Sequence, residues 1–240
     1  MTPLSPHRRT PPETPSTGLA DPGVCLRIPR SAFSLNGFRE WVLSDDLPEK
    51  LRVTLVDEEI YLDMSKEEIQ THALVKAEIA RMLMNLNRQF KLGQFFLDGV
   101  LLSNEKAEVS NNPDAVLMKW ETLEEGRVRL VEGGKKRGQL MEIEGAPDWV
   151  LEIVSDSSVK KDTKKLRSAY ARAGIGEYWL VDARGPEIHF QILQLRKNGY
   201  GPAPTKAGWQ HSRLFQRDFR LVREMSRLGL WEYTLEVKDQ

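Results

Sequence analysis

Apolar residues recur along the chain with two spacings, one typical of helices and one typical of strands. The longest helical pattern follows Ser65, where apolar positions three and four residues apart predict a helix that ends at Gly93. Its apolar stripe consists of Ile69, His72, Val75, Ile79, Met82, Leu83 and Leu86. Ser65 and Glu68 have the spacing of a capping box, so we expect the helix to begin at Ser65.

Shorter apolar runs predict two further helices and several strands. Helices are expected over 33–43 and over 161–173, and Gly174 ends the second of these. Strands are expected over 51–56, 60–64, 95–102, 114–118, 128–131, 139–143, 149–154, 178–181 and 188–193. The residues that lead to Asn111, Asn112 and Pro113 are polar and predict a loop. Strands that alternate with helices predict an α/β or α+β domain around a mixed sheet.

The first 24 residues differ in composition from the rest of the chain. They contain six of the 13 prolines, several serines and threonines, and two arginines. Such a stretch cannot bury enough apolar surface to offset the entropy of ordering it. We therefore predict a disordered, proline-rich tail over residues 1–24.

The overall composition excludes several classes of protein. The 240 residues include 35 basic and 35 acidic side chains, which excludes a protein that holds nucleic acid through overall positive charge, although a local basic patch is compatible. The single cysteine, Cys25, excludes a disulfide scaffold and fits a reducing cytoplasm. Apolar runs fall short of the ~20 residues of a membrane span, so we expect no membrane partner.

Two carboxylates interrupt otherwise apolar predicted strands. Glu152 lies inside the strand 149–154, and Asp114 opens the strand 114–118 after a proline. Burial of a carboxylate is costly unless the group is paired, protonated or bound to a metal. A buried ion pair for Glu152 and a turn at Asp114 are the structural alternatives.

The spacing of strands favours Asp114 as the partner of Glu152. Asp148 lies four residues earlier on the same strand, about 13 Å away, whereas a neighbouring strand lies about 4.8 Å across a sheet. We expect Asp114 and Glu152 to converge, and Asp148 to end a turn.

Three segments in this order resemble one protein family. They are the tripeptide 112–114, the strand 147–155 and the run 170–182 that leads from a helix into a strand. They are similar to the Uma-type family of "putative restriction endonucleases", a former domain of unknown function in the PD-(D/E)xK nuclease superfamily. The resemblance covers about 65–190 and implies a restriction-endonuclease-like fold, a central mixed sheet flanked by helices. Residues 25–240 would then form one nuclease-like domain with an extension at each end of this core.

The resemblance also implies a divalent-metal site that acts on DNA. Asp114, Glu152 and the backbone carbonyl of Ile153 would hold Mg²⁺ or Mn²⁺, for which hard oxygen ligands are suited. The metal would polarise a phosphodiester and lower the pKa of an attacking water.

One position departs from the pattern of the superfamily. A lysine usually stands two residues after the glutamate, where this chain has Val154, and the helix lysine of Uma-type relatives corresponds to Leu166. By helix angle, Lys165 lies at the edge of the buried stripe and is the first choice for a lysine that serves the site. Lys161, at the helix start, is the second choice. The alternative is that these lysines and Lys164 are all solvated.

The long helix contributes two further candidates, Glu68 and His72. The superfamily sometimes has a helix glutamate beside the metal, which makes Glu68 an additional candidate ligand. The favoured interpretation is that Glu68 caps the helix and His72 is a core histidine. Tyr170 is more typical of a core position, but it shares a helix face with Asp162 and could hydrogen-bond to a carboxylate.

Two functions are therefore compatible with the sequence. The first is a cytoplasmic, Mg²⁺-dependent endonuclease that hydrolyses DNA phosphodiester bonds. The second is a catalytically silent nuclease fold that binds nucleic acid or protein, which Val154 and the even charge balance favour. The C-terminal residues 226–237 could pack on the core or on the second subunit of a homodimer.

Overall fold

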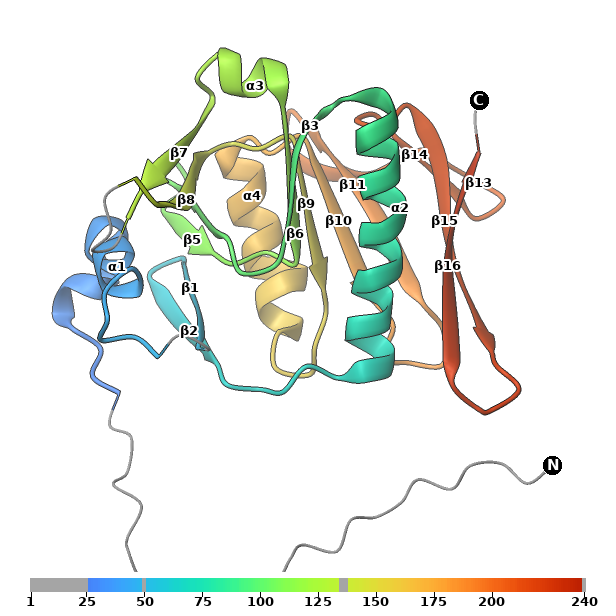
Figure 1. Cartoon of the computed structure of the whole chain (residues 1–240), viewed down its shortest axis with the longest axis horizontal. Coiled ribbons are helices and arrows are strands. Elements are labelled where there is room, and N and C mark those ends of the chain that lie inside the picture. Colours follow the sequence, from blue (N-terminus) through green and yellow to red (C-terminus); the bar gives the residue numbers. More distant parts are fainter. Residues whose placement is uncertain (1–25, 49–50, 134–137, 239–240) are drawn as a thin grey trace, which may run out of the picture.

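A computed structural model describes residues 26–48, 51–133 and 138–238 of the chain. The disordered tail predicted over residues 1–24 lies outside the described residues. Those that are described form three β-sheets with helices between them (Figure 1). A mixed sheet with a helix on either face forms the centre, so the predicted α+β fold class is confirmed.

The central sheet has the strand order β12-β11-β10-β9-β6-β3. Its strands are β3 (Gly93–Leu97), β6 (Ala115–Lys119), β9 (Trp149–Ile153), β10 (Glu177–Asp182), β11 (His189–Arg196) and β12 (Gly199–Pro202). Strands β9 and β10 are parallel, and the other neighbours are antiparallel. A parallel pair requires a crossover connection, which the helical segment 159–173 supplies.

Helices cover both faces of the central sheet. On one face lies α2 (Leu74–Phe90), which the π-helical turn η2 (Ile69–Ala73) precedes. On the other face lies α4 (Arg167–Ala173), preceded by the π-helical turn η3 (Lys161–Leu166) and ended by Gly174 with φ 88°. The prediction of a capped start at Ser65 is wrong, because Glu68 is the N-cap and its side chain accepts from Thr71 N. Ile69 is 71% exposed, since the α-helical spacing does not hold across the wider turn.

A second sheet has the order β2-β1-β5-β4-β8-β7 and lies on the α4 side of the central sheet. Its strands are β1 (Arg52–Val56), β2 (Glu59–Asp63), β4 (Leu101–Asn104), β5 (Val109–Asn111), β7 (Val128–Glu132) and β8 (Leu140–Gly145). The short helices α1 (Leu35–Val42) and α3 (Trp120–Glu124) flank this sheet.

Two strand predictions in this region are wrong. The expected strand 95–102 is two strands in different sheets, because Asp98 and Gly99 both have positive φ, 53° and 69°, and turn the chain. The expected polar loop before Asn112 contains β5, whose polar residues Ser110 and Asn111 are buried. The sequence did not indicate this strand, because its polar residues resemble those of a loop. They are buried nevertheless, since they form hydrogen bonds inside the protein.

A third sheet, β13-β14-β15-β16, lies beside α2 and packs on the same face of the central sheet (Figure 1). Its strands are β13 (Thr205–Lys206), β14 (Trp209–Ser212), β15 (Arg217–Met225) and β16 (Trp231–Lys238). Leu235 N donates to Glu78 Oε1 of α2 at 2.9 Å, and Trp231 N donates to Gln70 Oε1 at 3.1 Å. The C-terminal residues 226–237 thus pack on the core, one of the two alternatives considered.

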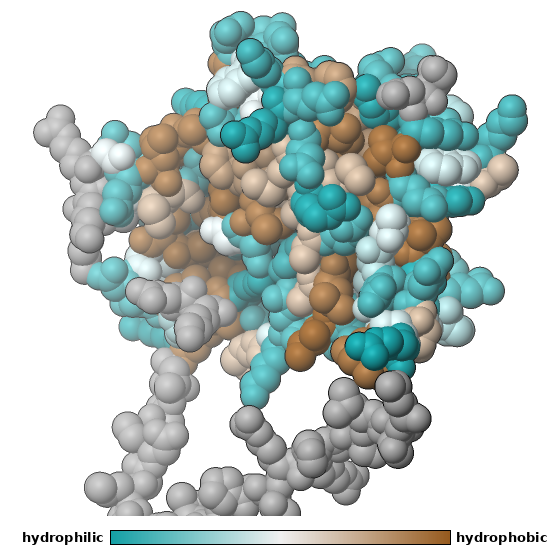
Figure 2. Space-filling view, turned by 45° about the vertical axis from the view of Figure 1, so that its right-hand side comes forward, coloured by the Kyte–Doolittle hydropathy of each residue, from teal (hydrophilic) through white to brown (hydrophobic). Residues whose placement is uncertain are grey.

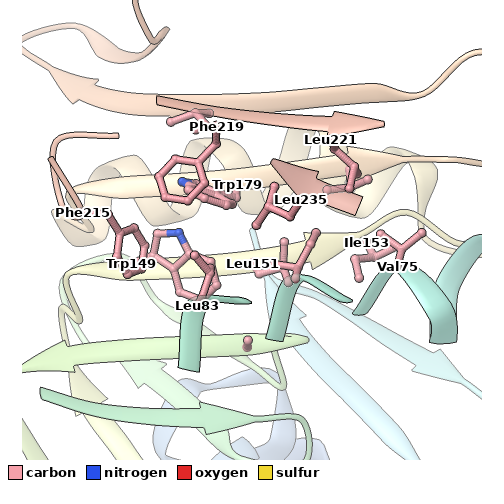
Figure 3. Packing of buried hydrophobic residues seen from close by; sticks show 14 of the residues in the cluster. Val75, Leu83, Trp149, Leu151, Ile153, Trp179, Phe215, Phe219, Leu221 and Leu235 are labelled. Atoms are coloured by element: carbon pink, nitrogen blue, oxygen red, sulfur yellow. The ribbon is translucent and has the colours of Figure 1, made fainter. Parts of the chain in front are cut away.

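Aromatic rings join the central sheet to the third sheet (Figure 3). Trp179 of β10 lies 5.6 Å from Trp149 of β9 and 4.9 Å from Phe219 of β15, between ring centroids. Leu83 of α2 and Leu235 of β16 complete this cluster. Truncation of such a buried tryptophan to alanine typically costs about 3–5 kcal/mol, so this packing holds the strands of the candidate site rigidly in place.

The surface over α2 and the C-terminal strands is mixed, while hydrophobic side chains gather more densely towards the side of the second sheet (Figure 2). Exposed Leu140 and Met141 of β8 and Trp120 of α3 contribute to this apolar surface. Within the described ranges, no helix has the length and apolar character needed to span a membrane.

Candidate active site

Asp114 and Glu152 lie side by side where β6 begins and β9 ends. The antiparallel register pairs Ala115 with Leu151, and Asp114 N donates to Leu151 O at 3.1 Å. The next position brings Asp114 next to Glu152, because neighbouring strands lie about 4.8 Å apart. Both side chains are almost fully buried, 4% and 3% exposed. The structure therefore brings the two sequence-predicted carboxylates together.

Glu152 is held by two neutral hydrogen-bond donors. Asn111 Nδ2 of β5 and the Tyr170 hydroxyl of α4 donate to Glu152 Oε1, at 2.8 and 2.7 Å. Burial raises the pKa of Glu152 well above its usual value; the charge of Lys161 opposes this rise, while the negative charges of Asp162 and Asp114 add to it. Burial and the two neighbouring carboxylates therefore disfavour the ionised form of Glu152.

The ionised form of Asp114 is stabilised, in contrast to that of Glu152, because cations and an N–H group surround it. Ile153 N donates to Asp114 Oδ2 at 2.7 Å, and His72 Nε2 lies 3.6 Å from the same oxygen. Lys76 Nζ and Arg52 lie 3.6 and 3.9 Å from Oδ1. Burial acts to raise the pKa of Asp114, but His72, Lys76 and the Ile153 N–H hold it below its usual value. Asp114 is therefore ionised at neutral pH.

A second row of charges supports His72 and Lys76. Glu67 Oε1 accepts from His72 Nδ1 at 2.9 Å and also pairs with Lys76, which contacts Asp98 Oδ2 at 2.9 Å. Burial acts to lower the pKa of His72, but the carboxylates of Asp114 and Glu67 raise it overall. The sequence pattern did not indicate Glu67, because this residue precedes the helix and its contacts depend on the path of the loop. The structure does not bring Glu68 to the carboxylate pair; its side chain caps η2.

Lys161 is the lysine that lines the same cavity as Asp114 and Glu152. Its Nζ lies 2.6 Å from Asp162 Oδ1, and its side chain is only 13% exposed. Burial acts to lower the pKa of Lys161, but the negative charges of Glu152, Asp162 and Asp114 raise it overall. Lys161 is therefore a permanent cation beside Glu152.

Lys165, the first choice from the sequence, lies elsewhere. Its Nζ is 3.3 Å from Asp57 Oδ2 and 3.4 Å from Glu59 Oε1, at the turn between β1 and β2. Lys165 departs from its expected position because residues 161–166 form a π-helical turn, which has more residues per turn than an α-helix. That turn places Lys161 in the site and Lys165 outside it.

The charged groups surround a small cavity of about 40 Å³. Asp114, Glu152, Ile153, Lys161 and Asp162 line it, together with Arg52, Thr54, Asp63, His72, Asn111, Asn112, Ser155 and Ser158. These residues come from the β1–β2 hairpin, the starts of both helical segments, and the segments around the start of β6 and the end of β9, elements that Figure 1 shows towards the lower part of the molecule. A larger cleft of about 320 Å³ shares Arg52, Asp63, His72 and Ser155 with it. The cavity therefore adjoins this cleft.

The donor set suits a hard divalent cation bound partly through water. In the described part of the chain, His, Cys, Asp and Glu side chains form no group of three or more that could hold a metal. Mg²⁺ commonly uses only one or two carboxylates and keeps several waters. Among described residues, none donates a hydrogen bond to Glu152 Oε2, which leaves that oxygen available. Asp114, Glu152 and the Ile153 carbonyl thus fit Mg²⁺ or Mn²⁺ and do not fit a metal that needs an all-protein cage.

Comparison with known proteins gives a family and a fold. The model of the Uma2 family, described as "Putative restriction endonuclease", matches residues 38–224. A crystal structure of a "putative nuclease belonging to DUF820" from Anabaena variabilis is similar, with 18% sequence identity and a TM-score of 0.53. The match covers 76% of this chain and 90% of that one, and it shows a shared fold. A search of curated proteins finds no match.

Proposed function

The chain belongs to the Uma2 family of "putative restriction endonucleases" and has the restriction-endonuclease-like fold, and from this premise we propose that it is a metal-dependent nuclease that hydrolyses DNA phosphodiester bonds. The observation that carries this proposal is that Asp114, Glu152 and Lys161 line one cavity, which adjoins a larger cleft. The proposal keeps the cytoplasmic location that the single cysteine favours.

Asp114 and Glu152 would hold the metal through their carboxylate oxygens, with the Ile153 carbonyl as a third ligand. When bound, Mg²⁺ or Mn²⁺ polarises a phosphate oxygen and lowers the pKa of a water. Asp114 is already ionised, because His72 and Lys76 stabilise its charge. Glu152 is oriented by Asn111 and Tyr170, which both donate to Oε1, so Oε2 would be the oxygen that holds the metal.

Lys161 would serve the metal site in place of the lysine that the superfamily has at the position of Val154. Its raised pKa keeps the ammonium protonated, so it acts as a charge and hydrogen-bond donor and not as a base. A preorganised cation in a water-poor site stabilises the negative charge that develops on the phosphate and orients the attacking water. The ion pair with Asp162 holds Lys161 in that position.

The direct test is cleavage of supercoiled plasmid by purified protein with Mg²⁺ or Mn²⁺, with EDTA as the metal-free control. We expect nicking that Asp114→Ala and Glu152→Ala each abolish. Glu124→Ala, which removes an exposed glutamate of α3, is the matched control and should cut like the wild type. Metal-dependent cutting that survives both site substitutions would contradict the assignment. Absence of cutting by the wild type would favour the catalytically silent module instead.

A further inference from the structure

The outer face of the helical segment 159–173 forms one wall of a basic cleft. The cleft has a volume of about 690 Å³, and the β11–β12 hairpin forms its other wall. Six cationic side chains line it, namely Lys106, Lys164, Arg167, Arg172, Arg196 and Lys197. No Asp or Glu of the described residues lines it, although acids and bases are equal in number over the whole chain. The positive charge is therefore concentrated on this surface.

The arginines of the cleft are held by the protein itself. Arg167 donates to Tyr200 O at 3.2 Å, and Arg196 donates to Pro202 O. Arg172 donates to Asp57 Oδ1 at 2.8 Å. These contacts fix the hairpin and the β1–β2 turn against α4, so the cleft is a preformed surface.

The three lysines of the cleft have free ammonium groups. Lys106, Lys164 and Lys197 are exposed, and none forms an ion pair with a described residue. Like charges that gather without a counter-charge repel one another, and a bound anion would relieve that repulsion. A site with three free ammonium groups and three fixed guanidinium groups fits a ligand with several phosphates.

The cleft is adjacent to the candidate active site along the helix. Lys161 lines the inner cavity, and three residues later Lys164 lines the outer cleft. From Lys164 to Arg172 the helix rises about 12 Å at about 1.5 Å per residue. Phosphates of one DNA strand are spaced about 3.4 Å along the duplex axis, so this length spans three to four of them.

We propose that this basic cleft binds the phosphate backbone of the DNA duplex beside the scissile bond, an inference that rests on the proposed nuclease function. The reacting phosphate would bind in the larger cleft of about 320 Å³ that adjoins the cavity, and that cleft has side chains of both charges. It is lined by Arg52, Lys66 and Arg184 but also by Asp63, Glu67, Glu68 and Asp156. That surface cannot attract a polyanion by charge alone, so the outer cleft supplies the electrostatic attraction.

The test is the salt dependence of duplex binding by the full-length protein. A fluorescent ~20-base-pair duplex is titrated in EDTA between about 50 and 200 mM salt, so that binding is measured without cleavage. The test variant carries Lys106→Ala, Lys164→Ala and Lys197→Ala. The control variant carries Arg88→Ala, Lys206→Ala and Arg227→Ala, which removes three exposed cations from α2 and the C-terminal region.

We expect the cleft variant to bind at least about tenfold more weakly at 0.1 M salt, with a salt slope smaller by about 2.7 for three lost phosphate contacts. The control variant should bind within about twofold of the wild type. Equal weakening in both variants, or wild-type binding by the cleft variant, overturns the inference. So does displacement of the duplex by an acidic polyglutamate peptide at the same charge concentration, which would assign the cleft to acidic proteins.

Cleavage assays separate this inference from the proposed function. Wild-type protein that binds through the cleft but cuts nothing leaves the DNA-binding assignment standing and removes the nuclease. Protein that cuts with the expected dependence on Glu152, while the cleft variant binds like the wild type, leaves the nuclease standing and removes the cleft.

Discussion

The helical segment 159–173 has two faces with opposite environments. Its inner face presents Lys161, Asp162 and Tyr170 to a buried carboxylate pair, in a cavity where each charge changes the pKa of its neighbours. Its outer face presents Lys164 and Arg167 to solvent in a cleft without acids. Lys161 and Lys164 are only three residues apart and chemically identical, so the difference between them arises from their surroundings, buried carboxylates for Lys161 and solvent for Lys164. The inner face is suited to the chemistry of one phosphate and the outer face to the attraction of many.

Among substitutions in the helical segment 159–173, the largest effect should come from removal of the inner lysine. We expect Lys161→Ala to lower the cleavage rate about 10²–10³-fold, as loss of one preorganised charge donor does in other active sites. Lys165→Ala is the matched control, because its side chain pairs with Asp57 and Glu59 outside the cavity. Single-turnover plasmid cleavage measures both, with circular dichroism to verify the fold. Equal losses in the two variants would remove the distinction between the faces.

A smaller effect is expected from the tyrosine that orients Glu152. Tyr170→Phe removes the hydroxyl that donates to Glu152 Oε1, and loss of such a supporting hydrogen bond typically costs about 10–100-fold in metal affinity or activity. Tyr200→Phe is the matched control, because it removes a hydroxyl that donates to Ile175 O on the outer side. The Mg²⁺ concentration that gives half-maximal cleavage should rise for the first variant and stay unchanged for the second. A rise in both would show that rigidity of the helix, and not orientation of Glu152, sets metal affinity.

The smallest effect concerns stability in the absence of metal. Because the pKa of folded Glu152 is raised, the unfolded state releases this proton at about pH 4.3, while the folded state keeps it until its own pKa is reached. Stability therefore falls as pH rises through that window. Glu152→Gln has no proton to lose, so in EDTA its Tm should exceed that of the wild type by at least about 2 °C at pH 8, with a smaller gap near pH 4.

Scanning calorimetry at the two pH values measures this difference. If the Tm of Glu152→Gln lies below that of the wild type by the same amount at both pH values, the prediction is contradicted. The two hydrogen bonds to the carboxylate, and not its charge, would then dominate the stability of the inner face.

Much of the central sheet could be predicted from the sequence, because its strands and helices follow regular apolar patterns. The convergence of Asp114 and Glu152 followed from strand spacing once both were placed on neighbouring strands. What could not be predicted depends on local geometry without periodic signal. The turn at Asp98 and Gly99 divides one apolar run between two sheets, and the third sheet beyond residue 204 was not predicted.

The choice of lysine shows the same limit at the site. The helix-angle argument ranked Lys165 above Lys161 on the assumption of α-helical geometry throughout. The π-helical turn over 161–166 reverses that order. Glu67 was missed for a related reason: it precedes the helix, so its contact with His72 and Lys76 depends on the path of a loop. Buried polar networks are specified by tertiary contacts that one sequence does not display.

The central claim is that Asp114 and Glu152 form a divalent-metal site. Isothermal titration calorimetry of the purified protein with Mn²⁺ and with Mg²⁺ tests it without reference to activity. We predict one ion bound per chain, with the heat signal lost in Asp114→Ala and in Glu152→Ala and retained in Glu124→Ala. Absence of binding at millimolar metal, or binding that persists in both site variants, would contradict the account.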